Sequence, residues 1–455
     1  MNAILSNGFV RPLIRFEFAA GVVDTSPPTC FSSFSQNRSV KQAASFELTL
    51  LYVPGTFGES QALTMHQLLL SSVKQEVRYQ YGYVVPGGTP VWQNQQYVGM
   101  FTSYTEDLQE GWLTYKICGV AKSVAVITPT ANPNIENIVG KQTMVKPSVV
   151  AETMINSEET GMKPLFQDYE LHIDHTDEEV KSSGIKIASG VPVQQVLAGK
   201  PNADGTTFNG GIVSYSHKNF NPFSSLSAAQ MVSASKSGAQ IAQQEPFICY
   251  FDNVDNGKKG SFYYVPKFSR PVSNIYVYNY GNSYIDSDVL SFNVSVDCTV
   301  AMATIGATDK VSFNTDPDGN LIGTTYNILD MNGFIPESYT TISGFKNSAF
   351  LSATSIADAL CFPYEATMTV IGQTQCSQLL DKIQVNIMFN GVPHPGLSGR
   401  YVILEITDDL SDSGFTTTFK LLRDYQGGSD LKELLDNSHA TTLQWVDECL
   451  QADYA

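Results

Sequence analysis

Apolar and polar residues alternate over much of the 455-residue chain, at the period-two spacing of strands that bury one face. In the first part of the sequence, the alternation is clearest at residues 13–18, 45–53 and 76–84. Residues 60–73 lie between the second and third runs and have helical spacing, which predicts one short helix. The segment 96–121 has the pattern of a closing hairpin. We therefore predict a strand-rich domain over residues 1–130.

The pattern changes over residues 131–273, which we predict to form a mixed helical insert domain. Apolar residues recur at helical spacing in three segments, 146–156, 191–199 and 224–244. Ser148 precedes the first helical run and is the expected N-cap, because its hydroxyl can accept from free backbone N–H groups. A β-hairpin is predicted at residues 246–268, with a tight turn at Asp255-Asn256-Gly257.

Alternation returns after residue 274 and predicts a second β domain over residues 274–423, with an insertion around residues 325–355. In the segment "KIQVNIMF", Ile383, Val385, Ile387 and Phe389 share one face. Residues 424–455 leave this pattern and predict a helical tail. The predicted fold class is mainly β (α+β), with two antiparallel β-barrel domains and helical or mixed insert domains.

The closing hairpins of the two β domains share an order of residues. The first contains, in order, Tyr97-Val98, Glu106-Asp107, Gly111 and Trp112, and the second Tyr401-Val402, Asp408-Asp409, Gly414 and Phe415. The spacings differ, because the first strand is two residues longer before its acidic pair and its turn is one residue shorter. A duplication and the general similarity of β-hairpins both explain the match. A duplication would give a ring of such chains twice as many modules as subunits.

The charge balance argues against stable nucleic-acid binding. The chain has 27 Lys and Arg against 44 Asp and Glu, a formal net charge of −17, and phosphate backbones are bound mainly through cationic side chains. Only 16% of residues are charged, below the usual ~25%. That low fraction suits a surface covered by neighbouring proteins, and an ordinary acidic globular protein is the alternative.

Cysteine use and hydropathy indicate a protein that folds in the cytoplasm. The seven cysteines are odd in number and widely spaced, with no Cys-x-x-Cys pair, which favours free thiols. We expect no signal peptide at the N-terminus and no membrane span, because no run approaches 18 apolar residues.

The few possible metal ligands do not form a persuasive site. His172, Asp174 and His175 lie in "LHIDHTDEE", but on a strand His175 would point away from the other two. The segment "NTDPDGN", with Asp316, Asp318 and Asn320, lacks the bidentate Glu of a calcium loop and contains Pro317. We predict polar turns at both places and no cofactor or metal.

We also predict no catalytic residues, because no nucleophile elbow, phosphate loop or zinc-protease motif is present. Within each acid pair, Glu106/Asp107 and Asp408/Asp409, adjacent side chains point to opposite faces of a strand and cannot flank one glycosidic bond. We expect these acids to keep strand ends soluble. Cys361 and Cys376 show no sign of thiolate activation and are expected to be buried small hydrophobes.

The C-terminal stretch resembles the closing domain of baseplate hub proteins of contractile-tailed bacteriophages. The matching motifs are Ile371-Gly372, the strand from Lys382 to Phe389, Ser398-Gly399-Arg400-Tyr401-Val402, the strand from Ile406 to Asp408, Gly414-Phe415-Thr416-Thr417 and Arg423. One departure is that Val402 follows Tyr401 directly, without an intervening residue. The hairpin "ICYFDN…GSFYYVPK" also resembles the insert domain of that family. About a third of the chain matches in this way.

The resemblance implies a chain with two barrels of the tail-tube type that assembles as a homotrimer. Three chains would then adapt the six-fold tail tube to the three-fold central spike, within the baseplate of the virion. It also implies contacts with other baseplate proteins, assembly in the host cytoplasm, and DNA that passes through the ring without being held.

Three other functions remain open from the sequence. The first is a distal tail or tube-initiator protein of another tail type. The second is a tail-associated peptidoglycan hydrolase, which the missing catalytic motifs disfavour. The third is a receptor-binding protein, in which Tyr79, Tyr81 and Tyr83 would stack on sugars, although packing of a half-buried strand explains these tyrosines equally.

Overall fold

The computed structural model describes residues 11–24, 31–52, 59–84, 88–134, 142–185, 187, 189–201, 208–216, 247–281, 286–296, 313–315, 321–324, 364–372, 377–394, 397–411 and 414–423. The predicted helical tail at 424–455, the insertion around 325–355 and the helix at 224–244 lie outside the described residues. The model is mainly β, as the sequence predicted.

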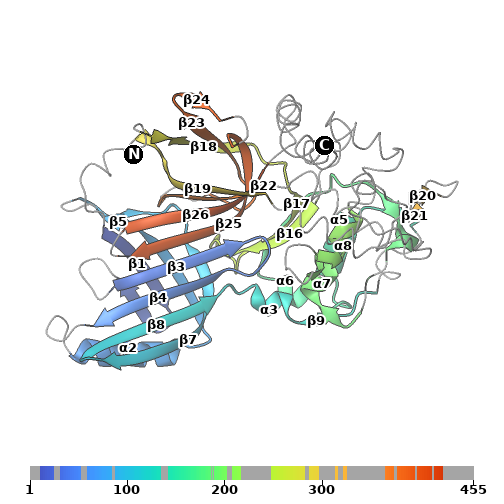
Figure 1. The fold of residues 1–455 in the computed structure, drawn as a ribbon. Helices are drawn as coiled ribbons and strands as arrows, with labels where there is room; N and C mark the ends of the chain where they lie inside the picture. Colours follow the sequence, from blue (N-terminus) through green and yellow to red (C-terminus); the bar gives the residue numbers. More distant parts are fainter. Residues whose placement is uncertain are drawn as a thin grey trace, which may run out of the picture.

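The N-terminal module comprises residues 11–120 (Figure 1). Its elements are β1 (Arg11–Phe18), β2 (Gly21–Asp24), β3 (Phe31–Ser39), β4 (Ser45–Tyr52), α2 (Glu59–Ser72), β5 (Glu76–Val84), β6 (Val91–Trp92), β7 (Tyr97–Gln109) and β8 (Trp112–Val120). Helix α2 confirms the helix predicted at 60–73. Alternate residues of the strands turn inward and form an aromatic core around Phe16, Phe34, Phe46 and Tyr79.

The insert lies to one side of the modules and has a core of its own (Figure 1). Its helices are α3 (Val124–Ile127), α5 (Pro147–Asn156), α6 (Lys163–Phe166), α7 (Val193–Leu197) and α8 (Ile212–Tyr215), with a 3-10 turn at Ser182–Gly184. Its strands are β9 (Thr130–Ala131), β10 (Met144–Val145), β11 (Glu170–Ile173), β12 (Val180–Lys181), β13 (Val191–Pro192), β14 (Gly199–Pro201), β15 (Phe208–Gly210), β16 (Phe247–Asp252) and β17 (Ser261–Pro266). In the described part of the chain, no helix is long and apolar enough to cross a membrane.

Two local predictions in the insert need correction. Ser148 is not an N-cap, because α5 begins at Pro147 and Lys146 occupies the cap position. The Ser148 hydroxyl instead donates to the Asp177 carboxylate at 2.5 Å, and its backbone N–H donates to the same carboxylate at 2.8 Å. Strands β16 and β17 pair as the predicted hairpin. Their connection runs over residues 253–260 and is longer than the tight turn expected.

The C-terminal module comprises residues 272–296 and 364–423 (Figure 1). Its strands are β18 (Val272–Asn279), β19 (Val289–Val296), β22 (Tyr364–Ile371), β23 (Lys382–Phe389), β24 (Val392–Pro393), β25 (Gly399–Ser411) and β26 (Gly414–Arg423), and a separate pair is formed by β20 (Phe313–Thr315) and β21 (Leu321–Thr324). Ile383, Val385 and Ile387 are buried on one face of β23, as predicted, whereas Phe389 at its end is 37% exposed.

The two modules have the same strand order. The N-terminal module runs β3-β4-β8-β7-β5-β1 across the sheet, and the C-terminal module runs β19-β22-β26-β25-β23-β18. In both, this is the second, third, sixth, fifth, fourth and first of the six strands in chain order. The one difference in direction is that β1 pairs antiparallel with β5, whereas β18 pairs parallel with β23.

The registers of the two modules also agree, down to their irregularities. The closing hairpins each contain a bulge, between Phe101 and Ser103 in β7 and between Ile403 and Glu405 in β25. Seven residue pairs follow the bulge in each hairpin, and two residues then connect the strands. A second bulge occurs one residue into both β3 and β19. Bulges are specific features of a sheet, so the modules are structurally equivalent.

This register corrects part of the alignment made from the sequence. Counted from the bulges, Thr105 to Leu108 do correspond to Thr407 to Leu410. However, the hairpins align without a gap, so Tyr97 corresponds to Gly399 rather than Tyr401, and Trp112 to Gly414 rather than Phe415. The turns are therefore equal in length. The two aromatic-rich hairpins were matched by residue type, and the sequence gave no sign of the bulge that sets the register.

One continuous sheet joins the modules, because the second half of β25 pairs antiparallel with β3. Leu410 and Phe415 of the C-terminal module pack into the aromatic core of the N-terminal module. Phe415 is 6% exposed and meets the Tyr81 ring edge-on, with ring centroids 5.8 Å apart. The C-terminal module keeps a second core of its own, so the described residues form three cores in all.

Candidate functional site

The structure does not bring the predicted histidine and aspartate residues together. His172 lies 3.5 Å from Glu170, whereas His175 contacts the Ser148 hydroxyl at 3.0 Å through its other neighbours in the insert. Asp174 accepts a hydrogen bond from the backbone N–H of Thr176 at 2.8 Å. The described residues contain no group of three or more His, Cys, Asp or Glu placed to hold a metal ion.

Several other candidates fall outside the described residues, namely Asp316, Asp318, Asn320, Cys361 and Cys376. Two cysteines can be assessed. Burial raises the pKa of the Cys249 thiol to about 12, and burial also raises the pKa of Cys118. Both thiols therefore remain protonated at neutral pH and are poor nucleophiles.

The acid pairs behave as predicted in one respect and differently in another. Asp408 is buried while the adjacent Asp409 is exposed, so neighbouring acids do point to opposite faces. However, Asp408 does not keep a strand end soluble. It is 2% exposed, and it accepts hydrogen bonds from the Tyr81 hydroxyl at 2.6 Å and from Thr417 at 2.5 Å. This half of β25 is covered by the N-terminal module, which the sequence could not indicate.

The clearest candidate surface is the face of the sheet that points away from the cores, here called the polar sheet face. Rows of paired residues cross it from one module to the other without a break. One row is Thr416, Asp409, Ser35, Glu47, Cys118 and Ser103. A second row is Ser291, Thr369, Thr418, Thr407, Asn37 and Ser45.

Hydrogen bonds and ion pairs hold the polar sheet face together. The Asn37 amide donates to Glu405 at 2.8 Å and to Thr407 at 3.2 Å, across the boundary between the modules. Its lysines are neutralised by neighbouring carboxylates: Lys116 lies 2.8 Å from Glu47, and Lys420 lies 2.9 Å from Glu405. Asp107 and Asp409 add further negative charge. A phosphate backbone would therefore find water and carboxylates here rather than a row of cations.

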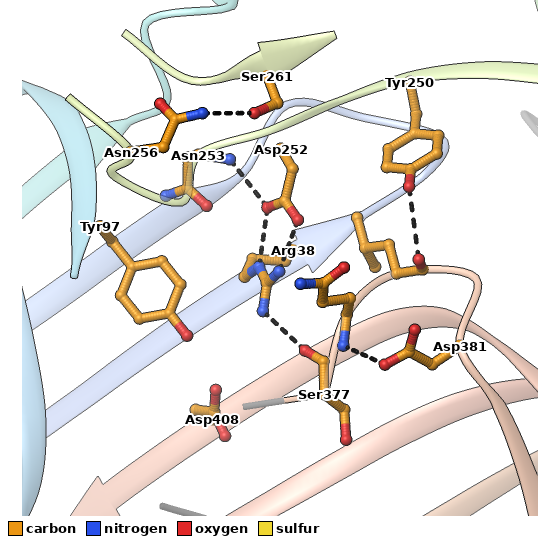
Figure 2. Close-up of polar contacts among 12 residues, drawn as sticks. Arg38, Tyr97, Tyr250, Asp252, Asn253, Asn256, Ser261, Ser377, Asp381 and Asp408 are labelled. Carbon is orange, nitrogen blue, oxygen red and sulfur yellow. Dashed lines mark hydrogen bonds and ion pairs between the residues drawn. The ribbon is translucent and has the colours of Figure 1, made fainter. Parts of the chain in front are cut away.

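A buried ion pair forms the junction between the two modules and the insert (Figure 2). Arg38 of β3 is 1% exposed, and its guanidinium donates to both carboxylate oxygens of Asp252 in β16, at 3.0 and 2.6 Å. The same guanidinium donates to the backbone carbonyl of Ser377 in the C-terminal module at 3.3 Å. It also stands over the Tyr97 ring, 5.3 Å from its centroid. One side chain thus contacts all three parts of the protein.

Further hydrogen bonds extend this junction to both sides. Asn253 follows Asp252 and donates from its amide to the Tyr79 hydroxyl at 3.0 Å. Burial raises the pKa of Tyr79 far above its usual range. On the other side, the Tyr250 hydroxyl donates to the Leu379 carbonyl at 3.4 Å (Figure 2). The β16 strand is therefore fixed to both modules by side chains with few other partners in reach.

Tyr79 and Tyr81 are not available to stack on sugars. They are 1% and 0% exposed and belong to the aromatic core of the N-terminal module. Their rings stack on Phe16 and Tyr97 at centroid distances of 5.2 and 5.5 Å. This observation removes the sequence feature that suggested receptor binding at β5.

The motif residues of the C-terminal stretch meet at the base of the second hairpin. Arg423 donates to the Tyr401 hydroxyl at 2.8 Å, to the Leu397 carbonyl at 3.2 Å and to the Ser398 carbonyl at 2.5 Å. Gly399 has a φ of +150°, and a Cβ on it would overlap the Arg423 guanidinium. Only glycine leaves room for this arginine, so these motif residues serve the fold.

Ile371-Gly372 and Gly414-Phe415 form a second contact of the same kind. The backbone N–H of Gly372 donates to the Phe415 carbonyl at 2.8 Å. A Cβ on Gly372 would overlap the Phe415 ring. The glycine therefore allows the strand end to lie directly against the buried aromatic side chain.

Comparisons with known proteins match the class that the C-terminal motifs indicated. No protein-family model matches the chain, and no curated protein matches it in sequence. A tail protein from Neisseria meningitidis MC58 is similar in structure, with 9% identity, coverage of 91% of this chain and 97% of that one, and a TM-score of 0.48. The 43 kDa tail protein of prophage MuSo2 from Shewanella oneidensis gives 11% identity, coverage of 90% and 98%, and a TM-score of 0.46.

A component of the type VI secretion system of E. coli is also similar, with 8% identity and a TM-score of 0.37, over 90% of this chain and 76% of that one. The structural neighbours are thus phage tail proteins and related secretion components, as the resemblance predicted. Because all three TM-scores are below 0.5, we base the functional proposal on the residues of this chain alone.

Proposed function

We propose that this chain is a structural hub of a phage tail baseplate, and that three copies form a ring that adapts a six-fold tube to a three-fold spike. The observation that carries the proposal is the structural equivalence of the two modules, in strand order and in the position of two bulges. A chain with two equivalent modules can present six similar units from three subunits, whereas its insert is present once per chain and repeats three times.

The polar sheet face supports a role as the wall of a channel. Its Ser, Thr and Asn side chains keep the surface hydrated, and its lysines are paired with carboxylates. A polymer of negative charge would pass such a wall without binding, because no counterions are released on contact. We infer that this face lines the ejection channel of the virion and that the chain is not an enzyme.

The junction around Arg38 supports a rigid subunit. It fixes the insert to both modules through contacts of one buried side chain. In the proposed hub, the insert would contact other baseplate proteins, and the junction would transmit its position to the ring. We take residues 1–130, 131–273 and 274–423 as the corresponding units of the chain.

Light scattering of the purified protein during size-exclusion chromatography tests the proposal. We expect a species of three times the 49.7 kDa chain mass, alone or on addition of the spike protein encoded beside it. A species that remains monomeric at high concentration, with and without spike protein, would contradict the hub. A stable six-chain ring would instead favour a tube-initiator protein, in which each chain counts once.

A further inference from the structure

The equivalence of the modules leaves two strand edges unmatched, one at each end of an eight-strand segment. That segment runs β19-β22-β26-β25-β3-β4-β8-β7. In the C-terminal module, β25 has two neighbours on its outer side: its first half pairs with β23 and its second half with β3. In the N-terminal module, the first half of β7 pairs with β5 in the equivalent register. Its second half, residues 103–109, pairs only with β8 among the described residues.

The strand that would complete this pattern is β19. It is the equivalent of β3, because both are the second strand of their module and both contain a bulge one residue from their start. Within the described residues, β19 pairs only with β22 and lies at the far end of the segment from β7 (Figure 1). The two edges are too far apart in one chain to meet each other.

We propose that residues 103–109 of β7 pair antiparallel with residues 291–295 of β19 in a second copy of this chain, in the register of β25 on β3. This proposal rests on the proposed ring and specifies how its subunits join. Transferring the register of β25 and β3 gives the pairs Leu108 with Phe292, Asp107 with Asn293, Glu106 with Val294 and Thr105 with Ser295.

Leu108 supplies independent support for this seam. It is 80% exposed, the most exposed of the large hydrophobic side chains described, although it lies on a strand at a core-facing position. Its equivalent Leu410 is 1% exposed, because it packs opposite Phe34 across the junction of the modules. Phe292, the equivalent of Phe34, is also a phenylalanine and is only partly buried. The same Leu–Phe pair thus recurs with its two members on opposite edges of the chain.

The charges on the β7 edge do not prevent this pairing. Acidic residues often protect exposed edges from association, and this edge carries Glu106 and Asp107. The equivalent residues of β25 are Asp408 and Asp409, and that strand is fully paired with β3. The proposed partners of Glu106 and Asp107 are Val294 and Asn293, so no like charges lie opposite each other.

Disulfide cross-linking tests both the seam and its register. Directly opposite residues of an antiparallel pair have Cα atoms ~4.5–5.5 Å apart, which a disulfide spans. We expect the double variant Leu108→Cys/Phe292→Cys to form covalent oligomers on oxidation, seen as a ladder in a non-reducing gel. The matched control is Leu108→Cys/Asn293→Cys, because Asn293 points to the opposite face of β19. Wild-type protein and each single variant measure the background from the native cysteines.

A second variant tests the seam without oxidation. Leu108→Asp places a charge on an exposed side chain, so the subunit should fold with an unchanged melting temperature but lose the oligomer. Leu70→Asp is the control, because Leu70 is 62% exposed on α2 and lies outside the seam. That variant should assemble as the wild type does.

The outcomes separate the seam from the hub. A cross-linked ladder with the Phe292 pair and none with the Asn293 pair supports the seam. Wild-type trimers without that ladder, or normal trimers of Leu108→Asp, would overturn the seam and leave the hub intact. Wild-type protein that stays monomeric would overturn both.

Discussion

Replacing Arg38 by methionine should destabilise the protein strongly, because it leaves the Asp252 carboxylate buried without its ion partner. Arg38 and Asp252 are 1% and 6% exposed, and their closest N–O distance is 2.6 Å. Removing one member of such a buried pair typically costs about 3–5 kcal/mol of folding free energy. Arg38→Met also removes the hydrogen bond to the Ser377 carbonyl, so we expect the upper part of that range.

Urea unfolding followed by tryptophan fluorescence and circular dichroism measures this effect. The double variant Arg38→Met/Asp252→Leu should recover most of the loss, since both buried charges are then absent. Lys163→Ala is the control, because it breaks an exposed pair with Glu158 and should leave the unfolding midpoint unchanged. A loss below about 1 kcal/mol for Arg38→Met would refute the assignment of this pair as the junction of the three cores.

Three further substitutions test other parts of the structure. Gly399→Ala should cost about 1–3 kcal/mol through overlap with Arg423, and more than Gly257→Ala, which also has a positive φ but open space around it; thermal melting of both variants decides this. Phe415→Ala should cost about 3–5 kcal/mol in urea unfolding, since Phe415 fills the neighbouring core; a change near zero would contradict that burial. Burial raises the pKa of Asp408, so its contribution to wild-type stability falls as pH rises from the unfolded pKa near 3.8 through the raised folded value. Asp408→Asn should remove that fall, and unfolding curves from pH 4 to 8 that keep the wild-type slope would contradict it.

The strand content and the pair of hairpins could be predicted from the sequence, because a strand with one buried face records that face as alternation. Ile383, Val385 and Ile387 are an example, and the acidic positions Asp107 and Asp409 were correctly matched. The alignment failed where aromatic residues recur, at Trp112. Residue type does not reveal a bulge, and the bulges define which positions are equivalent.

The junction could not be predicted from the sequence, because its members are far apart in the chain. Arg38 and Asp252 are separated by 214 positions, and Arg38 and Ser377 by 339. In the sequence, Arg38 is a single cation within a polar strand, which is the pattern of an ordinary solvated side chain. Asp408 was misjudged for the same reason, since its burial depends on the other module packing over β25.

The most direct test of the two-module ring is a cryo-electron microscopy reconstruction of the purified assembly, with no symmetry imposed. We predict six similar sheet units around a central channel, with the insert repeating three times at the periphery and the Ser- and Thr-rich face turned to the channel. A ring in which the N-terminal and C-terminal modules occupy different radii, or one with any number of subunits other than three, would contradict this account.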